Sequence, residues 1–72
     1  MTTGILQTIL FPLKKFSRDK AVEWLVNHGY VAHKVDKTSN FLRFRQREPM
    51  MYGRYYTITL ANGVEMVYER AP

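Results

Sequence analysis

Three arginines recur at every second position in the segment 40–49, which reads NFLRFRQREP. Because successive side chains of a β-strand point to opposite faces of a sheet, Arg43, Arg45 and Arg47 would share one face, and the apolar residues between them would share the other. A row of guanidinium groups on an exposed strand is suited to binding phosphates. The spacing therefore predicts a basic sheet face that binds an anion.

Most of the positive charge of the protein lies in the same part of the chain. Residues 30–54 hold six Lys or Arg and two Asp or Glu, an excess of four within a chain of net charge +5. Nearby tyrosines would be able to stack on bases. We predict that nucleic acid, or another anionic surface, binds a set of five basic residues: Lys34, Arg43, Arg45, Arg47 and Arg54.

Two other interpretations of this basic segment stay open. It also fits an ordinary solvated sheet face, on which Glu65 and Glu69 would neutralise part of the charge. It also fits a face that binds an acidic protein, because net charge does not distinguish among anionic partners. The chain contains no recognised nucleic-acid motif that would decide between them.

The histidines are the remaining candidates for chemistry. His28 and His33 fall on different predicted elements, and the chain has no cysteine and no carboxylate pair at ligand spacing. A metal site built on either histidine would lack partners, and no nucleophile stands beside them. We therefore expect no catalytic residue, metal or cofactor, and a protein that is not an enzyme.

A second candidate surface follows the arginine segment. Met50, Met51 and Tyr52 place two flexible thioethers and an aromatic ring in a predicted loop. Such residues form adaptable contact patches on other proteins, or they cover the open edge of a core. The alternative function is therefore contact with a viral or host protein, or a place in a virion or its assembly, through this loop.

The length and composition define the class of protein. A chain of 72 residues makes one domain, 1–72, and 46% hydrophobic residues with 14% aromatic residues are enough for a packed core without disulfides. The first residues lack the pattern of a signal peptide, and no segment reaches the length of a membrane span. We expect a soluble protein that is neither secreted nor bound to a membrane.

Hydrophobic periodicity then predicts the elements that position these residues. Ser17 is a candidate N-cap and Gly29 a candidate C-terminal stop for a helix between them. Period-two patterns and turn residues predict two hairpins after the helix. The expected elements are a strand at 5–11, a helix at 18–28, paired strands at 31–36 and 41–47, and paired strands at 55–60 and 64–69.

The two hairpins receive specific registers. A loop at 37–40 would place Lys34 opposite Arg43, a like-charge pair that favours a nearby anion. In the second hairpin, a loop of Ala61, Asn62 and Gly63 with a glycine bulge brings apolar residues together better than a two-residue turn does. This register pairs Leu60 with Val64, Ile58 with Met66, Tyr56 with Tyr68, Thr59 with Glu65 and Tyr55 with Glu69.

These elements predict an α+β fold, in which one helix packs on one face of a mainly antiparallel sheet of four or five strands. The order along the chain is one strand, the helix and then four strands, and the partner of the first strand is left open. The expected core residues are Trp24, Leu25, Val35, Phe44, Ile58 and Met66.

A set of positions spread over most of the chain carries a resemblance. They are the run 11–16 (FPLKKF), Ala21, Trp24, Leu25, the run 28–30 (HGY), the run 34–36 (KVD), Asn40, the run 43–46 (RFRQ) and Pro49. In these positions the chain resembles a small domain encoded by tailed phages, prophages and some large DNA viruses. The resemblance implies a phage or viral origin, a head-morphogenesis setting near prohead-protease-like proteins, and a location in the host cytoplasm or the virion.

Overall fold

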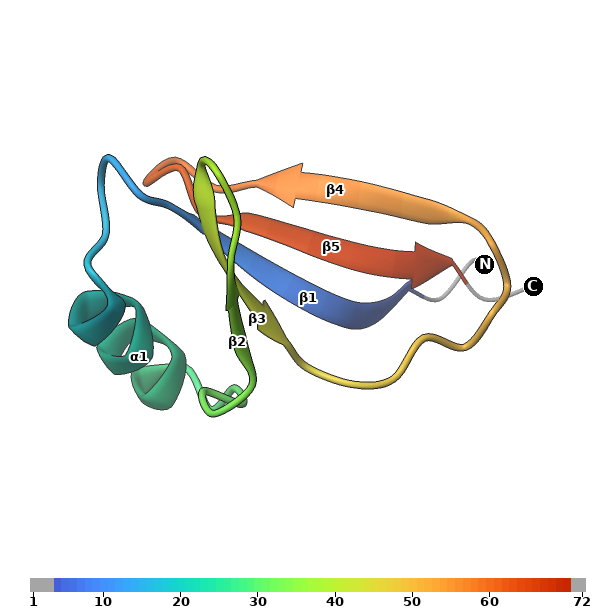
Figure 1. Cartoon of the computed structure of the whole chain (residues 1–72). Coiled ribbons are helices and arrows are strands. Elements are labelled where there is room, and N and C mark those ends of the chain that lie inside the picture. Colours follow the sequence, from blue (N-terminus) through green and yellow to red (C-terminus); the bar gives the residue numbers. More distant parts are fainter. Residues whose placement is uncertain (1–3, 71–72) are drawn as a thin grey trace.

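The protein forms one α-helix and a five-stranded antiparallel sheet, so the expected α+β fold is confirmed (Figure 1). The computed structural model describes residues 4–70, and the predicted domain limits at residues 1 and 72 lie outside the described residues. In chain order the elements are β1 (Gly4–Pro12), α1 (Arg18–Asn27), β2 (Val35–Lys37), β3 (Phe41–Arg45), β4 (Tyr55–Thr59) and β5 (Glu65–Arg70).

The first strand lies at the centre of the sheet. The spatial order is β2-β3-β1-β5-β4, so β1 pairs with one strand of each hairpin, which answers the question that the sequence left open. Ile9 and Phe11 are completely buried on one face of this central strand, and Leu10 between them is half-buried on the other face. A register shift between Leu6 and Thr8 forms a bulge in β1.

The helix begins and ends close to the predicted positions. The Ser17 hydroxyl accepts a hydrogen bond from the backbone N–H of Lys20 at 3.2 Å, which is the predicted N-cap. Gly29 has a φ of 77°, and the N–H of Tyr30 returns to the carbonyl of Leu25 at 2.9 Å. The helix buries Leu25 and Ala21 completely against the sheet.

Aromatic side chains make up much of the core. Phe11 is fully buried and meets the rings of Phe16, Trp24 and Phe44 edge to face, with centroids 5.1 to 5.6 Å apart. The expected core position of Trp24 is correct only in part, because its ring is half-buried and stacks on His28 with a centroid distance of 4.0 Å. Trp24 thus lies at the edge of the core and packs against it.

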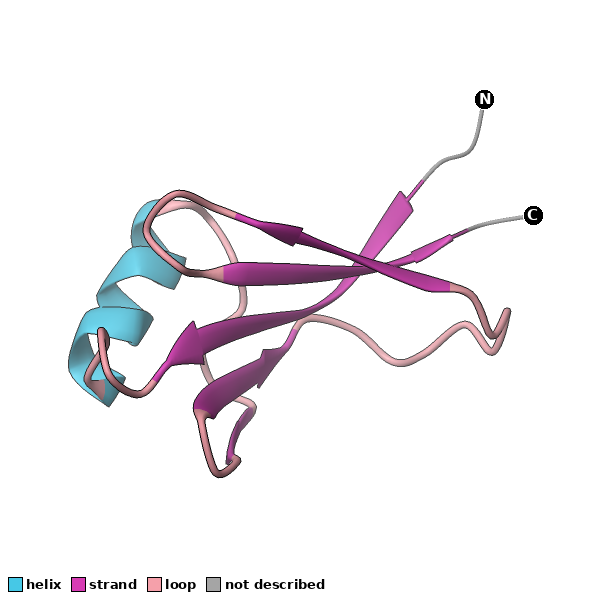
Figure 2. Ribbon diagram, turned by 90° about the horizontal axis from the view of Figure 1, so that it is seen from above, coloured by secondary structure: helices cyan, strands magenta, loops and turns pink. Residues whose placement is uncertain are grey.

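The helix covers only part of the sheet. In Figures 1 and 2, α1 lies across one end, and β1, β4 and β5 run on past it. Ile58, which we expected in the core, is on the outer strand β4 and is 46% exposed. Tyr56 and Tyr68 stack beyond the helix, and burial raises the pKa of the Tyr68 phenol, with smaller increases from Tyr30 and Tyr56.

The register of the second hairpin is confirmed. Leu60 donates its backbone N–H to the carbonyl of Val64 at 2.8 Å, and Gly63 takes a φ of 91° in the turn. A positive φ of this kind is the reason that a glycine occupies the bulge position. The pairs are Tyr55 with Glu69, Tyr56 with Tyr68, Thr57 with Val67, Ile58 with Met66 and Thr59 with Glu65.

The register predicted for the first hairpin is wrong. Asp36, and not Lys34, lies opposite Arg43, and Val35 lies opposite Phe44. The cross-strand pair is therefore one of opposite charges. Consequently, like-charge repulsion between Lys34 and Arg43 gives no reason to invoke an anion.

A threonine accounts for the different register of this hairpin. The N–H of Thr38 donates to the carbonyl of Phe41 at 2.8 Å, and the Thr38 hydroxyl accepts from the N–H of Phe41 at 3.1 Å. These bonds close the turn one residue later than the predicted loop at 37–40. Side chains of Ser and Thr often close turns through such bonds to the backbone.

A glutamine side chain replaces the missing part of the second strand. The predicted strand at 31–36 is reduced to Val35–Lys37, and the amide of Gln46 instead pairs with the backbone of Val31. Its Oε1 accepts from the Val31 N–H and its Nε2 donates to the Val31 carbonyl, each at 2.8 Å. One side chain thus satisfies both backbone polar groups of a part-buried residue.

Gln46→Ala should lower the free energy of unfolding by about 2 kcal/mol, because the N–H and carbonyl of Val31 lose their partners in a part-buried place. Urea unfolding followed by circular dichroism measures this change. Arg47→Ala is the matched control on the next, exposed residue, and its effect should stay within about 0.5 kcal/mol. Equal stability of the Gln46→Ala protein and the wild type would contradict this role.

Candidate functional site

Within residues 4–70, one face of the sheet carries no helix, and we call it the open face. Its residues follow from the register: Leu10 of β1 lies between Arg43 and Glu65, and Thr8 lies between Arg45 and Val67. Along β3, Leu42 and Phe44 are buried on the helix side whereas Arg43 and Arg45 are exposed. The predicted alternation of basic and apolar residues is therefore present in β3.

The two arginines of β3 differ in their partners. The guanidinium Nη2 of Arg43 lies 3.3 Å from Asp36 Oδ2, and both side chains are about half exposed. An exposed pair of this kind contributes only about 0 to 1 kcal/mol, so Arg43 can exchange the carboxylate for a phosphate at little cost. Arg45 has no ion-pair partner within residues 4–70. Both guanidinium groups are therefore available to bind a phosphate.

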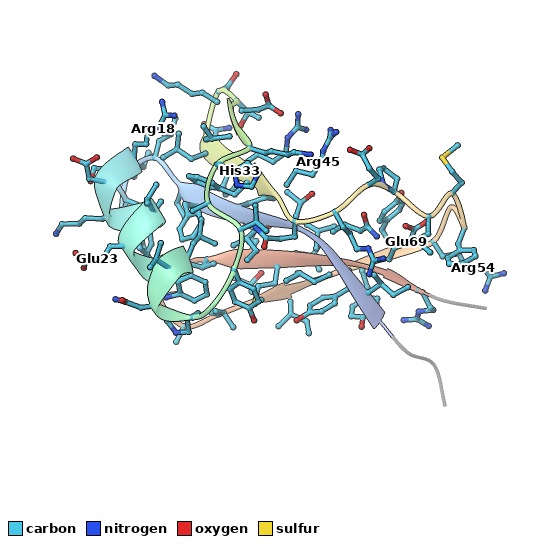
Figure 3. The ribbon with its side chains drawn as sticks, turned by 90° about the horizontal axis from the view of Figure 1, so that it is seen from below. Arg18, Glu23, His33, Arg45, Arg54 and Glu69 are labelled. Atoms are coloured by element: carbon cyan, nitrogen blue, oxygen red, sulfur yellow. The ribbon has the colours of Figure 1, made fainter. Side chains whose placement is uncertain are left out.

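The other predicted basic residues lie elsewhere. Lys34 precedes β2, next to Arg45, and its Nζ is 3.9 Å from Glu48 Oε1. Arg47 is exposed and lies beyond the end of β3. Figure 3 shows Arg54 at the end of the molecule farthest from the helix, well away from Arg45. The five predicted residues thus do not form one patch.

The glutamates that we considered as neutralising partners do not bind the arginines. Glu65 lies beyond Leu10 on the other side of β1, so two strand spacings, about 10 Å, separate its backbone from that of Arg43. Glu69 is completely buried and uses its carboxylate elsewhere. The charge of Arg45 is therefore not offset from β5.

Two adjoining depressions meet at Phe41. One, of about 360 Å³, lies on the open face and is lined by Thr8, Leu10, Phe41 and Arg43 among others. The second, of about 430 Å³, lies at the turn end of the sheet, and Phe41 lines it too. Phe41, a half-buried aromatic residue, thus lines two shallow hollows of largely apolar lining.

The second depression brings in cations that the sequence analysis left out. Lys14 and Lys15 follow Pro12 in the connection from β1 to the helix, and both are exposed. Their adjacency in the sequence was visible, but only the antiparallel pairing of Pro12 with Phe41 places them beside β3. We call the path of Arg45, Arg43, Phe41, Lys14 and Lys15 the basic track.

The residues predicted to contact a protein form an exposed and anchored loop. The N–H groups of Met50 and Tyr52 donate to the two carboxylate oxygens of Glu69, each at 2.7 Å. Between them Met51 is 86% exposed and has a φ of 65°, which is uncommon for a residue other than glycine. We call residues 50–52 the anchored tip.

The two histidines have different surroundings in the structure. His28 stacks on Trp24, and its Nδ1 lies 2.7 Å from the Trp24 carbonyl oxygen. His33 is exposed on the segment before β2. Among residues 4–70, no group of three or more His, Cys, Asp or Glu side chains is placed to hold a metal ion.

The helix present in the described part of the chain is too short to cross a bilayer. Comparisons of the chain with protein-family models, with curated proteins and with solved structures found no match. The open face and the anchored tip are therefore the candidate functional surfaces of the protein.

Proposed function

We propose that the protein is a non-enzymatic module that binds single-stranded nucleic acid along the basic track. The observation that carries the proposal is the position of Phe41, an aromatic residue that lines two adjoining hollows. One hollow continues to Arg43, and the other ends at Lys14 and Lys15. Proteins generally bind a single strand with basic side chains along its phosphate backbone and with aromatic rings that stack on its bases.

The shape of the surface favours a single strand over a duplex. Readout of the major groove needs a protruding helix or ribbon, whereas the helix of this protein packs against the sheet. Unstacked bases, by contrast, can lie on a flat sheet face that offers an apolar or aromatic platform. Phe41, Leu10 and Val67 provide such a platform on the open face.

Each residue of the track has a separate role in the proposal. Arg45 and Arg43 are two positions apart on β3, so their backbones are about 7 Å apart and their side chains contact successive phosphates. Phe41 stacks on a base at the bend of the track. Lys14 and Lys15 hold the phosphates on the far side of this bend.

Salt dependence tests the proposal. We expect a fluorescein-labelled oligothymidine to bind with an affinity that falls as salt rises. Four phosphate contacts at about 0.7 ions each give a slope of log K against log salt near −3. Fluorescence anisotropy measures it, with a blunt duplex of the same length as the weaker-binding control. A slope near zero, or preference for the duplex, would contradict the proposal.

The anchored tip supports a second candidate function, contact with another protein. The buried Glu69 carboxylate holds the backbone on both sides of Met51, and the Met51 side chain is exposed. The loop is therefore already ordered for contact before a partner binds. The resemblance to phage and viral domains would make that partner a virion or assembly protein. Met51→Asp separates the candidates, because it should abolish such a contact and leave oligothymidine binding intact.

A further inference from the structure

The outer strand β4 lacks the protection that edge strands normally have. Residues 55–60 read YYTITL, with no charge and no proline. Edge strands usually carry a charged residue or a bulge, or are very short, because their free backbone groups invite another strand. The opposite edge, β2, follows this rule, since it has three residues and two of them are charged.

Backbone hydrogen bonds show which groups of β4 point outward. Leu60 bonds to Val64 at one end of the strand, and Arg54 accepts from Arg70 at the other. In an antiparallel ladder alternate residues share a direction, so the even-numbered residues turn their N–H and carbonyl groups toward β5. The N–H and carbonyl groups of the odd-numbered residues therefore face away from the sheet.

These outward N–H and carbonyl groups belong to Tyr55, Thr57 and Thr59, which are evenly spaced about Thr57. If a second copy approached antiparallel with Thr57 opposite Thr57, Tyr55 of each copy would face Thr59 of the other. Each of these three pairs exchanges two backbone hydrogen bonds. A two-fold axis between the central threonines therefore satisfies every outward group of the strand.

The side chains agree with the same register. On the helix side, Tyr56 of each copy would lie opposite Ile58 of the other, an aromatic and β-branched pair of the kind that stabilises sheets. Ile58, 46% exposed and outside the core, would then gain a cover. Because β4 has no charge, the contact brings no like charges together, although each chain carries +5.

We propose that β4 is a self-association edge, through which two copies of this chain join their sheets into one continuous ten-stranded sheet. The contact is isologous, so it closes at two copies and leaves only the short, charged β2 edges outside. The two basic tracks would then lie on one extended face. The inference rests on β4 and does not depend on what the track binds.

The experiment uses the full chain and variants at Thr57. Static light scattering from about 10 µM to about 1 mM should show the mass rise from one copy toward two. Thr57→Lys and Thr57→Glu each place like charges face to face across the axis, and both should raise the dissociation constant roughly tenfold or more. Thr57→Val, which keeps the edge uncharged, should associate like the wild type.

Amide hydrogen exchange supplies a readout that needs no variant. The N–H groups of Tyr55, Thr57 and Thr59 should be unprotected in dilute protein and become protected in parallel with the rise in mass. The proposal is overturned if the protein remains one copy at about 1 mM, or if it associates while these three amides exchange freely. It is also overturned if the Lys and Glu variants associate like the wild type.

The outcome is separable from that of the proposed function. A Thr57→Glu protein that stays a single copy and still binds oligothymidine would support the self-association edge and the basic track together. A wild-type protein that self-associates but does not bind oligothymidine would contradict only the proposed function.

Discussion

Arg45→Glu should weaken oligothymidine binding by about thirtyfold, the largest effect that we expect from a single substitution on the basic track. The change removes one phosphate contact and sets a carboxylate against the backbone, a loss of about 2 kcal/mol. Arg45 has no ion-pair partner within the described residues, so the folded protein loses no internal pair. The slope of log K against log salt should become shallower, from near −3 to near −2, because one of four phosphate contacts is lost.

Arg54→Glu is the matched control for this prediction. Both substitutions change the net charge of the chain from +5 to +3, but Arg54 lies at the far end of the molecule (Figure 3). Its effect on binding should be less than about threefold, as expected of a remote and screened charge. Equal losses in the two variants would mean that net charge, and not the track, accounts for the binding.

Glu69→Ala should lower the free energy of unfolding by about 3 to 5 kcal/mol. The carboxylate is fully buried, and it accepts the N–H groups of Met50 and Tyr52, so its removal leaves two donors unpaired and a cavity beneath the loop. That loss is comparable with the whole stability of a domain of this size. Thermal and urea unfolding measure it.

Two further variants show whether the acceptor atoms or the volume are responsible. Glu69→Gln keeps the size but turns one acceptor oxygen into a donor, so it should still cost about 1 to 3 kcal/mol. Glu65→Ala, on the same strand and without a side-chain bond within residues 4–70, should cost about 0.5 kcal/mol. A Glu69→Gln protein as stable as the wild type would contradict the anchoring of the tip.

Local signals in the sequence were sufficient for most of the elements. Ser17 and Gly29 define the helix, and the second hairpin follows from the rule that apolar residues share a face. The first hairpin failed because a side chain changed its turn: Thr38 closes it one residue later, which replaces a like-charge pair by an opposite-charge pair. Turn closure by a hydroxyl leaves little trace in hydrophobic periodicity.

The candidate site was predictable only along one strand. Arg43 and Arg45 share a face because strand geometry requires it, and this needs no tertiary information. Lys14 and Lys15 join them only because β1 is central and pairs with β3, a long-range pairing that no local pattern contains. Arg54 was grouped with them for its charge, although the chain carries it to the other end of the sheet.

The role of Glu69 was missed for a related reason. In the strand pattern it stands on the open face, where a glutamate is normally solvated, and one of the interpretations left open made it a neutralising partner of the arginines. The connection from β3 to β4 instead passes over it and supplies two backbone donors. Burial of a carboxylate by a loop is decided by the path of that loop, which the residue types do not reveal.

Methyl NMR with an unlabelled oligothymidine tests the basic track most directly, because methyl groups report on each face of the sheet separately. Leu10 and Val67 lie in the open-face depression, whereas Val26 is 63% exposed on the helix. We predict that the Leu10 and Val67 methyl signals shift on titration and that those of Val26 do not. Shifts at Val26 alone, or no shift at Leu10 and Val67 at saturation, would contradict the assignment of the open face as the binding surface.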